Sequence, residues 1–211
     1  MSRGQPDVDG LGVSNLSLKS VARTATKTAL CGVAVALGAA SPAVASADTG
    51  SVAKASQAGC AGANTATTNV RRIRRVLLCL HNAERRSHGL SKLRLNRKLT
   101  GVATKHGRDM TARHYFAHYS SGHRDHMDRI ASSSYRPSAG CWTAGENLFY
   151  SEGAVTPRQL FSAWMHSPTH RQNIHREGWH DFGLGVVNTS PNGNSQGLTI
   201  VALFGIRGPC S

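Results

Sequence analysis

Acidic and aromatic side chains are scarce in this chain of 211 residues. It has 11 Asp and Glu against 25 Lys and Arg, which gives a formal net charge of +14, and only 6% of its residues are aromatic. It contains no P-loop, no Gly-x-Gly-x-x-Gly and no His-Glu-x-x-His string. Nothing therefore points to a nucleotide-binding enzyme or to a zinc protease of the usual pattern. With 39% hydrophobic residues, the chain can bury a core, and its length suits one domain plus a leader.

An apolar stretch near the N-terminus predicts a secretory signal peptide over residues 1–47. Residues 28–47 carry no charge and follow Lys19, Arg23 and Lys27. They end in Ala45-Ser46-Ala47, the small-residue pattern of a cleavage site. An uncleaved signal anchor is the alternative, since 20 uncharged residues could just span a bilayer. The sequence thus predicts a secreted, extracellular protein.

Cysteine is sparse, and no Cys-x-x-Cys spacing occurs, so a redox motif or a cysteine zinc ribbon is not expected. Four cysteines follow the predicted signal, and an even number in an exported chain indicates disulfides. Four cysteines allow three connectivities. We favour Cys60 with Cys79, which would tie an arm to a helix, and Cys141 with Cys210, which would hold the C-terminus.

Local patterns predict the organisation of the rest of the chain. Residues 48–68, rich in Ala, Thr, Ser and Gly, are expected to form a flexible arm, and residues 69–211 to form the folded domain. Apolar residues at helical spacing predict helices from residue 70 to a stop at Gly89, and over residues 97–115 behind Asn96 as cap. Thr156-Pro157-Arg158-Gln159 reads as a capping box that opens a third helix, which Pro168 should end.

The last 30 residues change to the period of a β-strand. Phe182, Leu184 and Val186 alternate with small residues, a turn signal spans residues 190–194, and a second apolar run covers residues 198–206. This pattern predicts an antiparallel hairpin. Helices first and strands late favour an α+β fold over a doubly wound sheet.

Histidine is abundant, with 11 residues, and several pairs have a spacing that could suit a metal. His114 with His118 and His166 with His170 are four apart, but Pro168 interrupts the second pair. Each pair alone is a weak signal, because a single histidine more often has a surface or packing role.

Four strings in order carry a family resemblance. They are Leu80-His81-Asn82-Ala83-Glu84-Arg85, Tyr115-Phe116-Ala117-His118, Gly145-Glu146-Asn147-Leu148, and the run from Trp164 to Ile174 that contains Ser167-Pro168-Thr169-His170-Arg171. Followed by Phe182-Gly183-Leu184-Gly185-Val186, they resemble the CAP superfamily (cysteine-rich secretory proteins, antigen 5 and pathogenesis-related 1), in its secreted bacterial branch. The resemblance covers about residues 73–207. It implies a three-layer α-β-α sandwich with a small antiparallel sheet.

The resemblance also implies a cleft lined by histidines and acidic residues, which binds a divalent metal in some members. His118 and Glu146 occupy matching motif positions, and His170 is the third member expected in the bacterial branch. Two family positions depart from the pattern: a later histidine is absent from the region of residues 198–202, and Ser167 replaces a second acidic residue. Two imidazoles and one carboxylate would suit zinc with one open position. A buried hydrogen-bonded network without metal is the alternative.

Three functions remain open from the sequence. The first is a non-catalytic protein whose cleft, built from His118, Glu146 and His170, binds a divalent metal such as zinc or a small ligand. Lipid is the class that the resemblance supports in eukaryotic members. The second is an extracellular zinc-dependent hydrolase. The third is a cationic module for anionic envelope polymers, without a signature for specific nucleic-acid binding. It rests on basic residues that crowd residues 71–98: Arg71, Arg72, Arg74, Arg75, Arg85, Arg86, Lys92, Arg94, Arg97 and Lys98.

Overall fold

A computed structural model of the protein describes residues 59–209. The predicted signal peptide over residues 1–47, most of the predicted arm, and Cys210 lie outside the described residues. No helix within 59–209 is both long enough and apolar enough to cross a bilayer.

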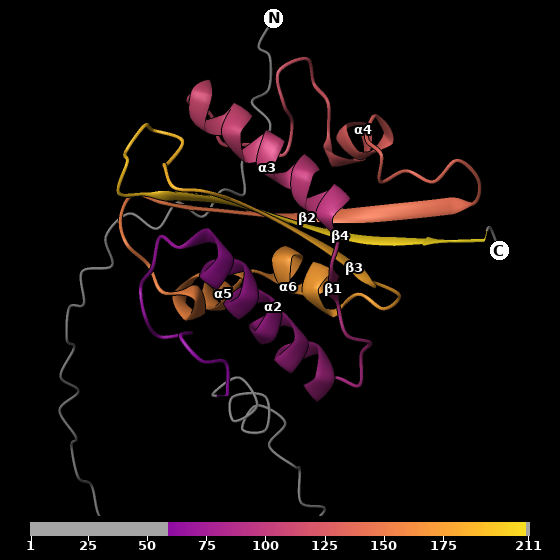
Figure 1. The fold of residues 1–211 in the computed structure, drawn as a ribbon, viewed down its shortest axis with the longest axis horizontal. Coiled ribbons are helices and arrows are strands. Elements are labelled where there is room, and N and C mark those ends of the chain that lie inside the picture. The colour runs from indigo at the N-terminus through magenta and orange to yellow at the C-terminus, as the bar shows by residue number, and fades with distance from the viewer. Residues whose placement is uncertain (1–58, 210–211) are drawn as a thin grey trace, which may run out of the picture.

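The domain has three layers, with a four-stranded sheet between two groups of helices (Figure 1). The strands lie in the order β1-β3-β4-β2. Helices α3 and α4 cover one face, and α2, α5 and α6 cover the other. The α+β sandwich expected from the sequence is therefore confirmed. The helices are α2 (Val70–Ser87), α3 (Arg97–Ala112), α4 (His126–Ala131), α5 (Pro157–His166) and α6 (Pro168–His175), and the strands are β1 (Arg94–Leu95), β2 (Cys141–Ser151), β3 (Asp181–Val187) and β4 (Leu198–Gly208).

The predicted helices form where the local signals place them. Asn69 caps α2 and Asn96 caps α3, each accepting backbone N–H groups of the first turn. Thr156 and Gln159 form a reciprocal capping box at α5. Helix α3 ends at Ala112, three residues earlier than expected, and His114 then adopts a positive φ of 56°, which no α-helix continues.

The sheet is larger than the predicted hairpin. Strands β3 and β4 pair antiparallel as expected, but β4 also pairs with β2 over all 11 residues of β2, from Cys141–Gly208 to Ser151–Leu198. Six consecutive residues of β2, 144–149, are buried. A strand buried on both faces shows no polar alternation, and this is why periodicity did not reveal it.

Two glycines of β3 allow α3 to lie directly on the sheet. A Cβ atom at Gly183 would lie 2.5 Å from the Leu99 backbone, and one at Gly185 would lie 2.4 Å from the Ala103 backbone. The close approach buries Leu99, Ala103 and Met110 against the upper face of the sheet.

Residues 59–68 are packed, which corrects the prediction that this part of the arm is flexible. Cys60 is bonded to Cys79 of α2, as expected, and Cys60 and Ala63 are buried in the core below the sheet. The Ala63 carbonyl accepts the backbone N–H of Arg158. Low hydrophobicity concealed this anchoring, because a disulfide rather than an apolar stripe supplies it. Cys141 is also disulfide-bonded.

Candidate functional site

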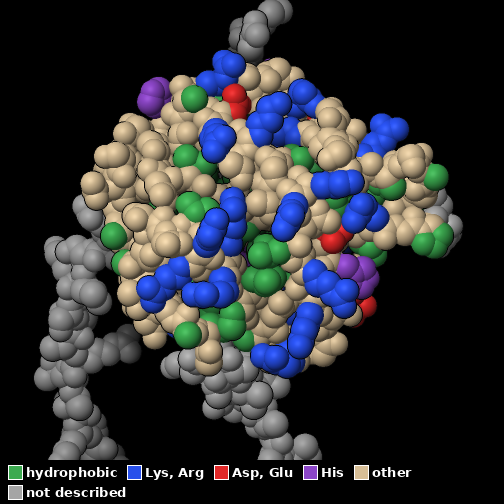
Figure 2. Space-filling model, in the orientation of Figure 1, with side chains coloured by type: hydrophobic (Ala, Val, Ile, Leu, Met, Phe, Trp, Pro, Cys, Tyr) green, Lys and Arg blue, Asp and Glu red, His purple; other side chains and the backbone are tan. Residues whose placement is uncertain are grey.

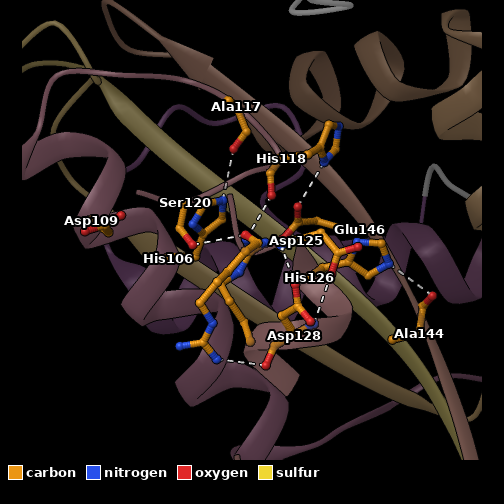
Figure 3. Close-up of polar contacts among 12 residues, drawn as sticks. His106, Asp109, Ala117, His118, Ser120, Asp125, His126, Asp128, Ala144 and Glu146 are labelled. Carbon is orange, nitrogen blue, oxygen red and sulfur yellow. Dashed lines mark hydrogen bonds and ion pairs between the residues drawn. The ribbon is translucent and has the colours of Figure 1, made fainter. Parts of the chain in front are cut away.

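The polar site is centred on Glu146, a buried carboxylate in the middle of β2. Its Oε1 atom accepts a hydrogen bond of 2.9 Å from His118 Nδ1, and its Oε2 atom accepts one of 2.6 Å from Arg129 Nη2. The Glu146 side chain is 1% exposed, whereas that of His118 is 46% exposed. His118 lies in the loop after α3, and Arg129 lies on α4. Figure 3 shows His118 and Glu146 pointing toward one another.

Burial alone would raise the pKa of Glu146. The hydrogen bond from His118 and the charge of Arg129 outweigh burial, and the pKa of Glu146 is lowered below its usual value of 4.5. Glu146 is therefore ionised at neutral pH, and both of its oxygens already face donors.

Arg129 and His106 hold the loop that carries His118. Arg129 Nη1 donates to the carbonyls of His118 and Arg124. His106, on α3, lies 3.0 Å from the Ala117 carbonyl through Nε2 (Figure 3). Burial lowers the pKa of His106, with Glu146 opposing and Arg129 adding to this effect. The site is thus a rigid network that joins α3, α4, the loop and β2.

A cleft of about 870 Å³ opens beside this network, between α3 and the segment that carries α4. His106 and Arg129 line it, so Glu146 lies behind its wall. Most of its charged lining is basic, and Asp109 is the one acidic residue among the described residues that line it. The basic lining residues are Arg97, Lys98, Lys105, Arg108, Arg124 and Arg129.

The structure brings two of the three expected site residues together and not the third. His170 lies on α6, in the helical layer opposite α3 and α4 (Figure 1), where its carbonyl accepts the Asn147 side chain. Asn147 follows Glu146, and neighbouring residues of a strand point to opposite faces of the sheet. The donor set around Glu146 therefore fits a metal poorly. One imidazole faces it, and the guanidinium of Arg129 opposes a second cation.

A different group of His and Glu is compatible with a divalent metal. Within residues 59–209, the group of three whose potential ligand atoms all lie within 4.8 Å of one another is Glu84, His88 and His175. It lies where the C-terminal ends of α2 and α6 meet, apart from the Glu146 network. Sequence reasoning missed it because the three residues belong to two helices and to no recognised motif.

Sequence reasoning also missed Arg129, although a signal was present. Helix α4 is too short for apolar periodicity, but Asp125 and Asp128 form a capping box at its start. Another string, Gly193-Asn194-Ser195-Gln196-Gly197, has the spacing of a serine-hydrolase elbow. It lies in the turn between β3 and β4, whereas a nucleophile elbow joins a strand to a helix.

Comparison with known proteins agrees with this architecture. The family model described as CAP, the cysteine-rich secretory protein family, matches residues 78–204. The chain belongs to this family. The match includes His118, Arg129, Glu146 and the Glu84 group.

Two curated relatives come from Bacillus subtilis (strain 168). The uncharacterised protein YkwD is 35% identical over 112 residues, which cover 52% of this chain and 40% of that protein. The uncharacterised membrane protein YlbC is 30% identical over 110 residues, which cover 52% of this chain and 30% of that protein. The chain thus matches less than half the length of either relative.

Solved structures share the fold at low sequence identity. An outer surface protein from Borrelia burgdorferi has a TM-score of 0.57 and 16% identity, covering 69% of this chain and 99% of that one. An extracellular protein with an SCP domain from Bacillus anthracis has a TM-score of 0.49 and 22% identity, covering 67% of this chain and 45% of that one.

Proposed function

We propose that this CAP-domain protein acts outside the cytoplasm as a binding protein, and that the cleft beside Glu146 takes a small ligand with an anionic group. The observation that carries this proposal is the basic lining of the cleft, six Lys and Arg against one Asp. Cations that converge on a concave surface favour a negatively charged occupant.

The arrangement of α3 supports this choice of ligand. Arg97, Gly101, Lys105 and Arg108 follow one another at intervals of three or four residues, and so share one face of the helix. Arg97, Lys105 and Arg108 are exposed. In Figure 2, Lys and Arg side chains are spread over the face in view, and acidic side chains are few. Mobile cations at the rim can therefore contact an anion while the network behind them stays in place.

The Glu146 network has a positioning role in this proposal. Arg129 neutralises Glu146 on one side and lines the cleft on the other. His118 and Glu146 thus shape the cleft, and Arg129 is the group that an anionic ligand meets. An exported location is supported by the disulfide of Cys60 with Cys79, since disulfides persist in oxidising compartments.

Binding of two soluble probes tests the proposal. Dihexanoyl phosphatidate, below its micelle concentration, should bind, whereas dihexanoyl phosphatidylcholine should not. Glycerol 3-phosphate serves as a third probe, which tells a free phosphate ester from a lipid headgroup. Calorimetric titration at low and moderate salt gives the affinities, and added salt should weaken binding because the contacts are exposed.

A matched pair of variants locates the binding. Lys105→Gln/Arg108→Gln removes two exposed cations of the cleft and should weaken phosphatidate binding by about 10-fold or more, since a hydrogen bond to a charged group contributes about 1.5–3 kcal/mol. Arg75→Gln/Arg86→Gln removes the same charge from exposed positions on α2 outside the cleft. Equal losses in the two variants would reduce the effect to net charge and sink the proposed cleft.

A further inference from the structure

We propose that Glu84, His88 and His175 form a binding site for one divalent transition-metal ion, with zinc as its expected occupant. The site joins the C-terminal ends of α2 and α6, in the layer of helices below the sheet. It is separate from the cleft beside Glu146 and does not depend on the function proposed for that cleft.

The distances suit a zinc ion. Glu84 Oε1 lies 3.0 Å from His175 Nε2 and 3.5 Å from His88 Nδ1. Zinc ligands lie about 2.0–2.2 Å from the ion, so neighbouring ligand atoms of a tetrahedral site are about 3.4 Å apart. The two separations bracket this value, so small side-chain rotations would complete the coordination.

The chemistry of the donors also suits zinc. Two imidazoles and one carboxylate are donor types that zinc takes in proteins, and three protein ligands leave a fourth position for solvent. The two rings already face each other, with centroids 4.1 Å apart and an angle of 32° between their planes. Two protonated rings at this distance would repel, whereas a shared metal ion would hold both rings in their neutral form.

The site is both anchored and accessible. The Glu84 side chain is only 6% exposed, and the neighbouring Arg85 is fixed by hydrogen bonds to the carbonyls of Ile174 and Arg176. The α2 and α6 ends are thus held together without the ion. The side chains of His88 and His175 are 44% and 25% exposed, and His175 lines a surface groove beside Arg171 and Arg176. A metal ion can therefore enter from solvent.

His88 has competing partners, and these define how tight the site can be. Its Nδ1 atom also lies 3.0 Å from the Glu84 carbonyl and 3.2 Å from Ser87 Oγ. Coordination through Nδ1 would replace these hydrogen bonds, so binding at this atom has an energetic cost. His175 and Glu84 already contact each other directly, and we expect them to be the stronger pair of ligands.

Zinc titration of the chelator-treated, oxidised protein tests the site, with calorimetry for stoichiometry and cobalt absorption as a second readout of tetrahedral coordination. The wild type should bind one ion. His175→Ala and His88→Ala should each weaken binding by at least ~100-fold, since even groups that only support a metal ligand contribute 10–100-fold.

Two control variants distinguish this site from other histidines. His166→Ala removes an exposed histidine of α5 outside the group, and His118→Ala removes the histidine that contacts Glu146. Both should bind zinc like the wild type, and all four variants should keep the wild-type circular dichroism spectrum. The proposal is overturned if the folded wild type binds no zinc at micromolar concentration, or if His88→Ala and His175→Ala bind it unchanged.

Discussion

His81 shows that a histidine within a family motif can serve the core. It lies on α2 and is fully buried among the rings of Phe161, Trp164, Phe182 and Phe204. Its Nδ1 atom lies 2.7 Å from the Leu77 carbonyl. Burial lowers the pKa of His81 from 6.5 to about 4, with the Leu77 hydrogen bond opposing this effect. The ring is therefore neutral in the folded protein at physiological pH.

This pKa shift predicts a loss of stability in mild acid. In the unfolded chain His81 takes up a proton near pH 6.5, and in the folded protein only near pH 4. Between these values the unfolded state binds more protons, so the free energy of unfolding falls as the pH falls. The total loss from this residue is about 3 kcal/mol at most. Urea unfolding at pH 7, 6 and 5 measures it, and in His81→Leu the same interval should show a shallower slope.

The contrast between His81 and His118 also shows what residue patterns can reveal. Both were visible as motif members, but only the structure shows that one is enclosed by aromatic rings and the other contacts Glu146. Arg129 belongs to no motif, yet it contacts the same carboxylate. Spacing along the chain does not encode which side chains converge, and the separation of His170 from Glu146 follows from the same limitation.

At the scale of elements, local signals predicted α2, α3, α5 and α6 because caps, prolines and apolar stripes lie within one helix. Strand β2 escaped because both of its faces are covered, and α4 escaped because six residues give no periodicity. The seating of α3 on β3 was also hidden, since it depends on two glycines that meet a helix about 80 residues away in the sequence.

That seating leads to a prediction for Gly185→Ala. The added methyl group would lie 2.4 Å from the Ala103 backbone, and a helix backbone cannot move aside as a flexible side chain can. Overpacking of a core costs about 1–3 kcal/mol, and we expect the upper end of this range. Denaturant unfolding measures the loss. Gly101→Ala adds a methyl group on α3 where no atom lies within 4 Å, and this control should be as stable as the wild type or more so.

The Cys60–Cys79 disulfide links the segment before α2 to the helix itself, across a sequence separation of 19 residues. Closing a loop of about this length stabilises a protein by about 3 kcal/mol. Cys60→Ser/Cys79→Ser should therefore unfold at lower denaturant than the wild type, by that amount. A matched Cys141→Ser variant reports the separate contribution of the second disulfide. An unchanged midpoint in the double variant would show that packing of Cys60 and Ala63 suffices.

On the scale of the whole molecule, the described domain separates two kinds of polar chemistry. The basic cleft and the Glu146 network lie on the side of α3 and α4, and the Glu84 group lies between α2 and α6. The sheet stands between them. Phosphatidate and zinc should therefore bind independently, and saturating either one should leave the affinity for the other unchanged within about twofold, because no shared two-state element couples the sites. Competition between the two in one calorimetric cell tests this.

The covalent link at Cys60 also decides how the domain would bear a mechanical load. A pull applied to the chain ahead of Cys60 bypasses residues 61–78, because the sulfur–sulfur bond carries the tension directly to Cys79. The force then enters the second half of α2, near Leu80, which is buried in the core below the sheet. A tether on that side would thus strain a packed helix instead of peeling away its first turns.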